Sequence, residues 1–160
     1  MINRIILFLL ILFIPLLLSA ETVLLYTISQ VDVVDEDQYG DLIESAVMNE
    51  FFNAGHIVFN VSVLGAVPEK GLEHFKEPAS MQMAKAGGAA FLLEVSLVYS
   101  DMKGRNLPGS AKYRFIDVFS GIMIKEGSVN IDKKWIDEGA LEDGLAAMGS
   151  SMASYALTFL

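Results

Sequence analysis

The apolar positions of the chain fall into blocks that alternate between strand and helix periodicity. Blocks rich in β-branched and aliphatic residues predict five strands, at residues 22–34, 56–64, 89–100, 111–119 and 122–131. Blocks in which apolar residues recur every three or four positions predict three helices, at residues 38–54, 79–86 and from 133 onward. The order β-α-β-α-β-β-β-α indicates an α+β fold, an α/β two-layer sandwich in which helices cover a mixed sheet.

The connections between these blocks carry the residues that turns and helix ends require. Gly55 is placed to cap the first helix, and Gly87-Gly88 to stop the second. Ser120-Gly121 separates two strands closely enough to predict a hairpin. Residues 65–78 and the polar stretch 101–110 are predicted to be loops.

The first twenty residues have the pattern of a cleavable secretory signal peptide. Arg4 precedes an apolar run, residues 5–18, that only Pro15 interrupts, and the small residues Ser19-Ala20 follow it. The alternative is an uncleaved membrane anchor, but the run is short for a bilayer core, which needs about 20 apolar residues. We therefore expect a signal peptide at 1–20, one domain at 21–160, and a mature chain that begins at Glu21 and is released into the periplasm.

Composition limits the possible partners and chemistry. The chain has no cysteine, which excludes a lipidated N-terminal cysteine, disulfides and thiolate chemistry. It has 11 Lys and Arg against 20 Asp and Glu, and only Arg4 of these lies in the leader, so the mature net charge is −10. This balance argues against binding to nucleic acid or to anionic lipid, both of which need a basic surface.

No arrangement of residues predicts catalysis. The two histidines are His56, at a turn, and His74, which with Glu73 and Glu77 forms a cluster too small to predict a metal site. The chain has no Gly-x-Ser-x-Gly elbow, no Gly-x-Gly-x-x-Gly and no P-loop. We therefore expect no enzyme activity, no cofactor and no metal.

Two polar positions inside predicted strands need a separate interpretation. Asp117 lies in an apolar strand just before the hairpin turn, where its carboxylate is expected to accept backbone N–H bonds. For a hydrolase, the least favoured function, it would be the best candidate residue. The sequence Asn60-Val61-Ser62 matches a glycosylation sequon, but it falls in a strand and is interpreted as a chance match.

Two short motifs resemble a superfamily of bacterial envelope proteins. Ala84 and Gly88-Ala89 precede a hydrophobic strand, and Asp117-Val118 with Ser120-Gly121 form a hairpin signature. This pairing resembles the superfamily that includes CsgG, LpoB, FlgO and the N-terminal domain of TolB. The resemblance implies scaffold roles for these residues: Gly88 and Ala89 pack a helix end on a strand, and Asp117, Ser120 and Gly121 shape the hairpin.

The resemblance also implies a function. CsgG and LpoB are lipoproteins, and CsgG has long membrane-spanning hairpins, whereas this chain has neither a lipid-bearing cysteine nor long loops. The expectation is a non-enzymatic periplasmic accessory or docking domain that helps assemble or regulate a flagellar, secretion or cell-wall complex. Its partners would be envelope proteins, contacted through edge strands or the two loops, and it would not insert directly into a membrane. The alternative is a carrier of a small molecule or lipid, with a cavity between sheet and helices.

Overall fold

The computed structural model describes residues 20–29, 38–63, 79–102, 104–137 and 139–160. Its strands are β1 (Thr22–Ser29), β2 (Ile57–Val63), β3 (Phe91–Met102), β4 (Arg105–Asp117) and β5 (Met123–Asn130). Its described helices are α2 (Gln38–Asn53), α3 (Ala79–Ala86), α4 (Lys133–Asp137) and α5 (Leu141–Leu157). The predicted leader, the loop at 65–78 with Glu73, His74 and Glu77, and the end of the first predicted strand lie outside the described residues.

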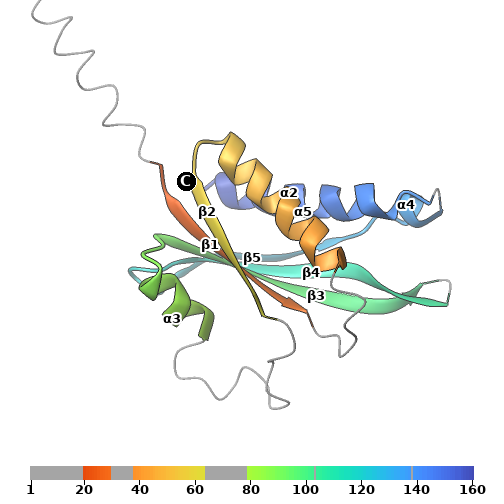
Figure 1. Ribbon diagram of the computed structural model, residues 1–160, viewed down its shortest axis with the longest axis horizontal. Coiled ribbons are helices and arrows are strands. Elements are labelled where there is room, and N and C mark those ends of the chain that lie inside the picture. The colour runs from red at the N-terminus through yellow and green to blue at the C-terminus, as the bar shows by residue number, and fades with distance from the viewer. Residues whose placement is uncertain (1–19, 30–37, 64–78, 103, 138) are drawn as a thin grey trace, which may run out of the picture.

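The strands form one mixed sheet in the order β2-β1-β3-β4-β5 (Figure 1). β1 pairs in parallel with β2 and β3, and β4 pairs antiparallel with β3 and β5. This confirms the α+β class and the mixed sheet. The parallel half follows from the two helical crossovers, and the antiparallel half from the hairpins.

One face of the sheet is covered by α2 and α5. Alternate residues of β1, β3 and β4 point into this layer and are fully or almost fully buried: Val23, Leu25, Leu93, Val95, Leu97, Ala111, Tyr113 and Phe115. The two helices run side by side in the same direction, because their first turns line one surface depression and Gly149 of α5 packs against the Ile43 carbonyl of α2. This layer is the main hydrophobic core.

The opposite face of the sheet is partly covered by α3. Met81 and Ala84 of α3 pack on Leu24 and Leu92, and Val118 belongs to the same cluster. The predicted sandwich of a mixed sheet covered by helices is confirmed, and the helices are divided between the two faces, with α3 opposite α2 and α5. This short helix joins two parallel neighbours of β1, and it packs over their apolar ends on the face that α2 and α5 leave open.

Two connections differ from the sequence prediction. The expected loop at 101–110 is mostly strand, because β3 and β4 continue to a tight turn at Gly104, whose φ is +75°. Pro108 is accommodated beside the register shift between Val98 and Tyr99. The last predicted helix is divided into α4 and α5, with Gly139 at φ +74° between them. No helix in the described ranges has the length and apolar character needed to cross a membrane.

Candidate functional site

Most of the large apolar side chains exposed on the described surface lie at one end of the molecule. Seven of the nine belong to segments that meet there, and we call these seven residues the apolar end: Phe52, Ile57, Phe119, Ile122, Met123, Phe159 and Leu160. The other two are Tyr155, near the end of α5, and Met83 of α3. Soluble proteins rarely gather exposed apolar side chains in this way unless the surface binds something.

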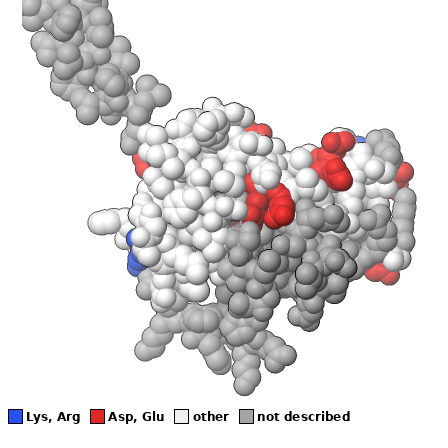
Figure 2. Space-filling view, in the orientation of Figure 1, with Lys and Arg blue, Asp and Glu red and all other residues white. Residues whose placement is uncertain are grey.

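Backbone hydrogen bonds across the first row of the sheet bring these segments together. Four backbone bonds, with N···O distances of 2.8–3.0 Å, link the segments from the start of β2 across to the start of β5. In each, the N–H of the first residue donates to the carbonyl of the second: Ile57 to Glu21, Ala90 to Thr22, Val118 to Ala90, and Asp117 to Ile122. α2 and α5 both end at this side of the molecule (Figure 1). In the space-filling view this end, at the left, has few charged side chains (Figure 2).

The hairpin turn between β4 and β5 forms the most exposed part of the apolar end. The Asp117 Oδ1 atom accepts hydrogen bonds from the Ser120 backbone N–H at 2.7 Å and from its hydroxyl at 3.0 Å. These bonds to Ser120 hold the pKa of the Asp117 carboxyl below its ordinary value. Gly121 has a φ of +70°. The turn built by these three residues presents Phe119, which is 100% exposed.

The other motif of the family resemblance, Ala84 with Gly88-Ala89, lies beside this turn. Gly88 has a φ of +70°, a conformation that favours glycine, and a Cβ atom there would meet nothing within 4 Å. The Ala89 N–H bonds to the Ala84 carbonyl at 2.9 Å, and Ala89 is buried. Gly88 and Ala89 therefore end α3 and direct the chain into β3 next to the hairpin, where they act through the backbone and by packing.

A groove extends the apolar end along the outer strand β2. It has a volume of about 710 Å³ and is lined by the last turns of α2 and the first residues of β2: Met48, Asn49, Phe52, Gly55, His56, Ile57 and Val58. Phe52 is 74% exposed and Ile57 58% exposed at its margin. The His56 ring accepts a hydrogen bond from the Glu21 N–H through Nδ1 at 3.3 Å. Among the described residues, no carboxylate or ammonium group lines this groove.

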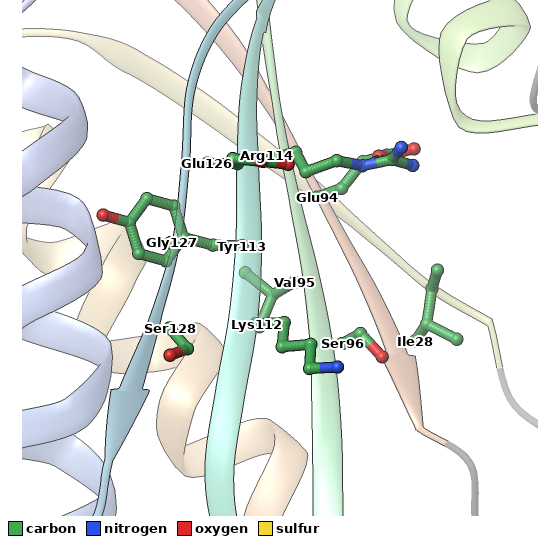
Figure 3. Close-up of a pocket in the computed structure, with 10 residues that line it drawn as sticks. All are labelled: Ile28, Glu94, Val95, Ser96, Lys112, Tyr113, Arg114, Glu126, Gly127 and Ser128. Atoms are coloured by element: carbon green, nitrogen blue, oxygen red, sulfur yellow. Dashed lines mark hydrogen bonds and ion pairs between the residues drawn. The ribbon is translucent and has the colours of Figure 1, made fainter.

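A second concave site lies on the sheet face opposite α2 and α5, and we call it the polar cleft. Its volume is about 540 Å³, and its polar lining consists of Glu94, Ser96, Lys112, Arg114, Glu126 and Ser128 (Figure 3). The alternative function requires a cavity between sheet and helices, but the layer under α2 and α5 is filled by buried side chains. The polar cleft is on the other face.

The polar cleft is organised around one buried carboxylate. Glu94 is 4% exposed, and its Oε2 atom accepts a hydrogen bond from Arg114 Nε at 2.8 Å and forms an ion pair with Arg114 Nη2 at 2.5 Å. Its Oε1 atom accepts the Ser80 hydroxyl of α3. Burial, with the charge of Glu94 as a second cause, raises the pKa of Tyr26. These contacts join α3 to β3 and β4 and satisfy a charge that would otherwise be costly to bury.

The remaining side chains of the polar cleft do not form a recognisable catalytic set. Lys112, two residues before Arg114 on β4, and Glu126, opposite Arg114 on β5, are both exposed. No histidine lines the cleft, and within the described ranges no three His, Cys, Asp or Glu side chains are close enough to hold a metal. The arrangement can bind through charge and hydrogen bonds.

The sequence pattern located the two scaffold motifs but gave no indication of the apolar end or of the polar cleft. Of the other residues considered from the sequence, His56 lies in the groove. Asn60 of the sequon donates a hydrogen bond to the Glu44 carboxylate of α2 at 2.7 Å. The lone Glu94 in the apolar strand at 89–100 was the available signal for the buried ion pair. The apolar end had no signal in any single segment, because its residues come from three separate parts of the chain: the turn from α2 to β2, the β4–β5 hairpin and the C-terminal residues.

No protein-family model matches the chain, and no curated protein matches it. Among solved structures, it is similar to the PelC dodecamer from Paraburkholderia phytofirmans, with 14% identity over 82% of this chain and 86% of PelC, at a TM-score of 0.44. It is also similar to lipoprotein GNA1162 from Neisseria meningitidis, with 18% identity over 71% of this chain and 82% of that one, at a TM-score of 0.41. A third similar structure is TolB from Acinetobacter baumannii, with 12% identity over 89% of this chain and 29% of TolB, at a TM-score of 0.45. TolB is also one of the proteins to which the two motifs pointed.

Proposed function

We propose that the protein is a non-enzymatic docking domain of the bacterial envelope, and that it binds an envelope protein through the apolar end. The observation that carries this proposal is the gathering of seven exposed large apolar side chains at one end of the described molecule. Aromatic and aliphatic side chains in such a position gain free energy when a partner removes them from water. The two sequence motifs support an envelope setting, with the leader directing the domain to the periplasm.

The turn motif explains why this surface is suited to docking. Phe119 stands on a turn that Asp117 and Ser120 fix by hydrogen bonds, so little conformational freedom is lost when it enters a partner. Ile122 and Met123 follow on the same hairpin and enlarge the contact. An aromatic side chain with other apolar side chains near it on the same surface is the usual centre of a protein interface.

The proposal is tested by comparing the proteins that co-purify from native envelope extracts with the wild-type chain and with Phe119→Ser. A central aromatic residue contributes about 2 kcal/mol or more to an interface, so we expect recovery of the specific partner to fall more than about tenfold. Lys133→Ser, at the exposed start of α4, is the control and should leave recovery unchanged. Equal recovery with both variants, each correctly folded, would contradict docking through the apolar end.

A further inference from the structure

We propose that the outer edge of β2 is a strand-addition site that takes an extended, uncharged apolar segment of a partner protein. The inference rests on the proposed docking function and names the mode of binding and the chemistry of the segment. It follows from a comparison of the two edges of the sheet, from the direction of the β2 backbone groups, and from the groove beside them.

The two edge strands are protected to different extents. β5 carries the charged pair Lys125 and Glu126, and its pairing with β4 is interrupted by a register shift between Phe115 and Ile116. Charges and irregular pairing are the usual means by which an edge strand avoids pairing with another chain. β2 reads Ile-Val-Phe-Asn-Val-Ser-Val, with no charge, no proline and no shift in its pairing with β1. β2 therefore has the character of a strand that pairs on both sides.

The register shows which β2 backbone groups are available to a partner. The Ile57 N–H bonds to the Glu21 carbonyl at 2.9 Å, on the β1 side. Backbone groups alternate in direction along a parallel strand, so Ile57, Phe59 and Val61 face β1. The N–H and C=O groups of Val58 and Asn60 therefore point away from the sheet, where an added strand would reach them.

The groove defines the chemistry of the added segment. It lies beside the first residues of β2 and is lined by Met48, Phe52, Ile57 and Val58 among others, and none of the described lining residues carries a carboxylate or ammonium group. A charged side chain placed there would lose hydration without finding a counter-charge, whereas an apolar one would bury surface. Alternate side chains of an added strand point to one face, so every second residue of the segment would be apolar.

The site is continuous with the apolar end. Phe52 and Ile57 belong to both surfaces, since they border the groove and are among the seven residues of the apolar end. A partner that covers Phe119 at the hairpin can extend along the same end of the sheet to β2. The strand-addition site thus supplies main-chain hydrogen bonds, and the hairpin supplies a separate side-chain contact.

The first test measures backbone amide hydrogen exchange in the purified protein by NMR. The amides of Val58 and Asn60 should exchange quickly, and those of Ile57 and Phe59 slowly, because only the latter two bond to β1. Slow exchange at Val58 and Asn60 in the protein alone would overturn the inference, since it would mean that the edge is already covered.

The second test adds an uncharged synthetic peptide, acetyl-Ser-Thr-Val-Ser-Val-Thr-Val-Ser-amide. Binding should slow exchange at Val58 and Asn60 by more than about tenfold at saturation, and a peptide with Asp in place of each Val should not bind. Val58→Pro removes one outward N–H and should weaken binding of the first peptide by more than about tenfold. Val58→Ala keeps the N–H and removes only part of a side chain that lines the groove, so it is the matched comparison and should weaken binding clearly less than Val58→Pro does. Equal binding to both peptides, or equal effects of the two Val58 variants, would contradict strand addition.

The outcome is independent of the test of the proposed function. Phe119→Ser should leave peptide binding at β2 unchanged, because the hairpin joins β4 and β5 at the opposite edge of the sheet from β2. If the peptide fails to bind while Phe119 still governs partner recovery, only the strand-addition inference fails. If the peptide binds but Phe119→Ser has no effect on recovery, only the proposed docking function fails. Protection of the β2 amides by phosphatidylcholine vesicles, unaffected by Val58→Pro, would instead assign the surface to lipid.

Discussion

The two faces of the sheet are stabilised in different ways. The face under α2 and α5 is packed almost entirely with apolar side chains that exclude water, among them Phe51, Leu93 and Phe115. The opposite face has a small apolar cluster under α3 and then changes to the polar cleft, where buried Glu94 is held by Arg114 and Ser80. The first face supplies most of the stability, and the second fixes the position of α3 through specific polar contacts.

The largest expected effect comes from the first face. Phe51→Ala removes a fully buried ring of α2 and should lower the free energy of unfolding by about 3–5 kcal/mol, because it loses buried area and leaves a cavity. Urea denaturation measures this. The adjacent Phe52 is 74% exposed, so Phe52→Ala is a matched control that should change stability by less than about 1 kcal/mol. Similar losses for the two variants would contradict the assignment of α2's buried face.

The polar contacts of the second face should come next. Arg114→Ala leaves the Glu94 carboxylate buried without its cation and should cost about 2–3 kcal/mol, below the range for a fully buried pair because the Arg114 side chain is 43% exposed. Lys112→Ala, on the same strand and face but exposed, should cost less than about 0.5 kcal/mol. The double variant Arg114→Ala with Glu94→Gln should regain part of the loss in thermal denaturation. No recovery would mean that the two side chains act independently.

The close contact between α2 and α5 gives a test of the helix packing on the first face. A Cβ atom at Gly149 would lie 2.6 Å from the Ile43 carbonyl oxygen, so Gly149→Ala must separate the helices. We expect a loss of about 1–3 kcal/mol in unfolding free energy, in spite of the better helix propensity of alanine. Ala147→Ser, on the exposed side of α5, is the control and should stay within about 0.5 kcal/mol. A more stable Gly149→Ala variant would show that the helices are not in contact there.

The smallest effect is expected at the hairpin turn between β4 and β5. The pKa of Asp117 is lowered in the folded protein, so the ionised carboxyl stabilises the fold above its unfolded pKa of about 3.9. This contribution is lost as the pH falls from that value through the lower folded pKa. Asp117→Asn should therefore lower the melting temperature slightly at neutral pH and change it little below the folded pKa, which reduces the acid dependence of the melting temperature in this range. An unchanged acid dependence would contradict the capping role of Asp117.

The sequence predicted the elements that have a strong local pattern. The run of aliphatic and β-branched residues in Ala89–Ser100 predicted β3, the helical spacing of Ile43, Val47 and Phe51 predicted α2, and Ser120-Gly121 predicted the hairpin. The stretch 101–110 was predicted to be a loop because its Gly, Pro and polar residues outweigh its local strand pattern. Its strand structure depends on pairing between β3 and β4 and on the register shift beside Pro108, which only the folded sheet provides.

The candidate surfaces were less predictable, because they depend on tertiary contacts. Glu94 finds Ser80 and Arg114 only when α3 packs on the sheet. Phe52, Ile57, Phe119 and Phe159 come from distant parts of the chain, and each alone is an ordinary exposed apolar residue. Their meeting at one end follows from the sheet order, which the pattern of strands and helices did not specify.

The most direct test of docking through the apolar end uses the fact that the chain has no cysteine. Phe119→Cys and Lys133→Cys each introduce one thiol, at the apolar end and at the start of α4, and the rate of maleimide labelling is measured in purified protein and in native envelopes. We expect the thiol at 119 to react quickly in purified protein and at least about tenfold more slowly in envelopes, and the thiol at 133 to react at the same rate in both. Equal rates for the thiol at 119 in the two preparations would contradict the proposal.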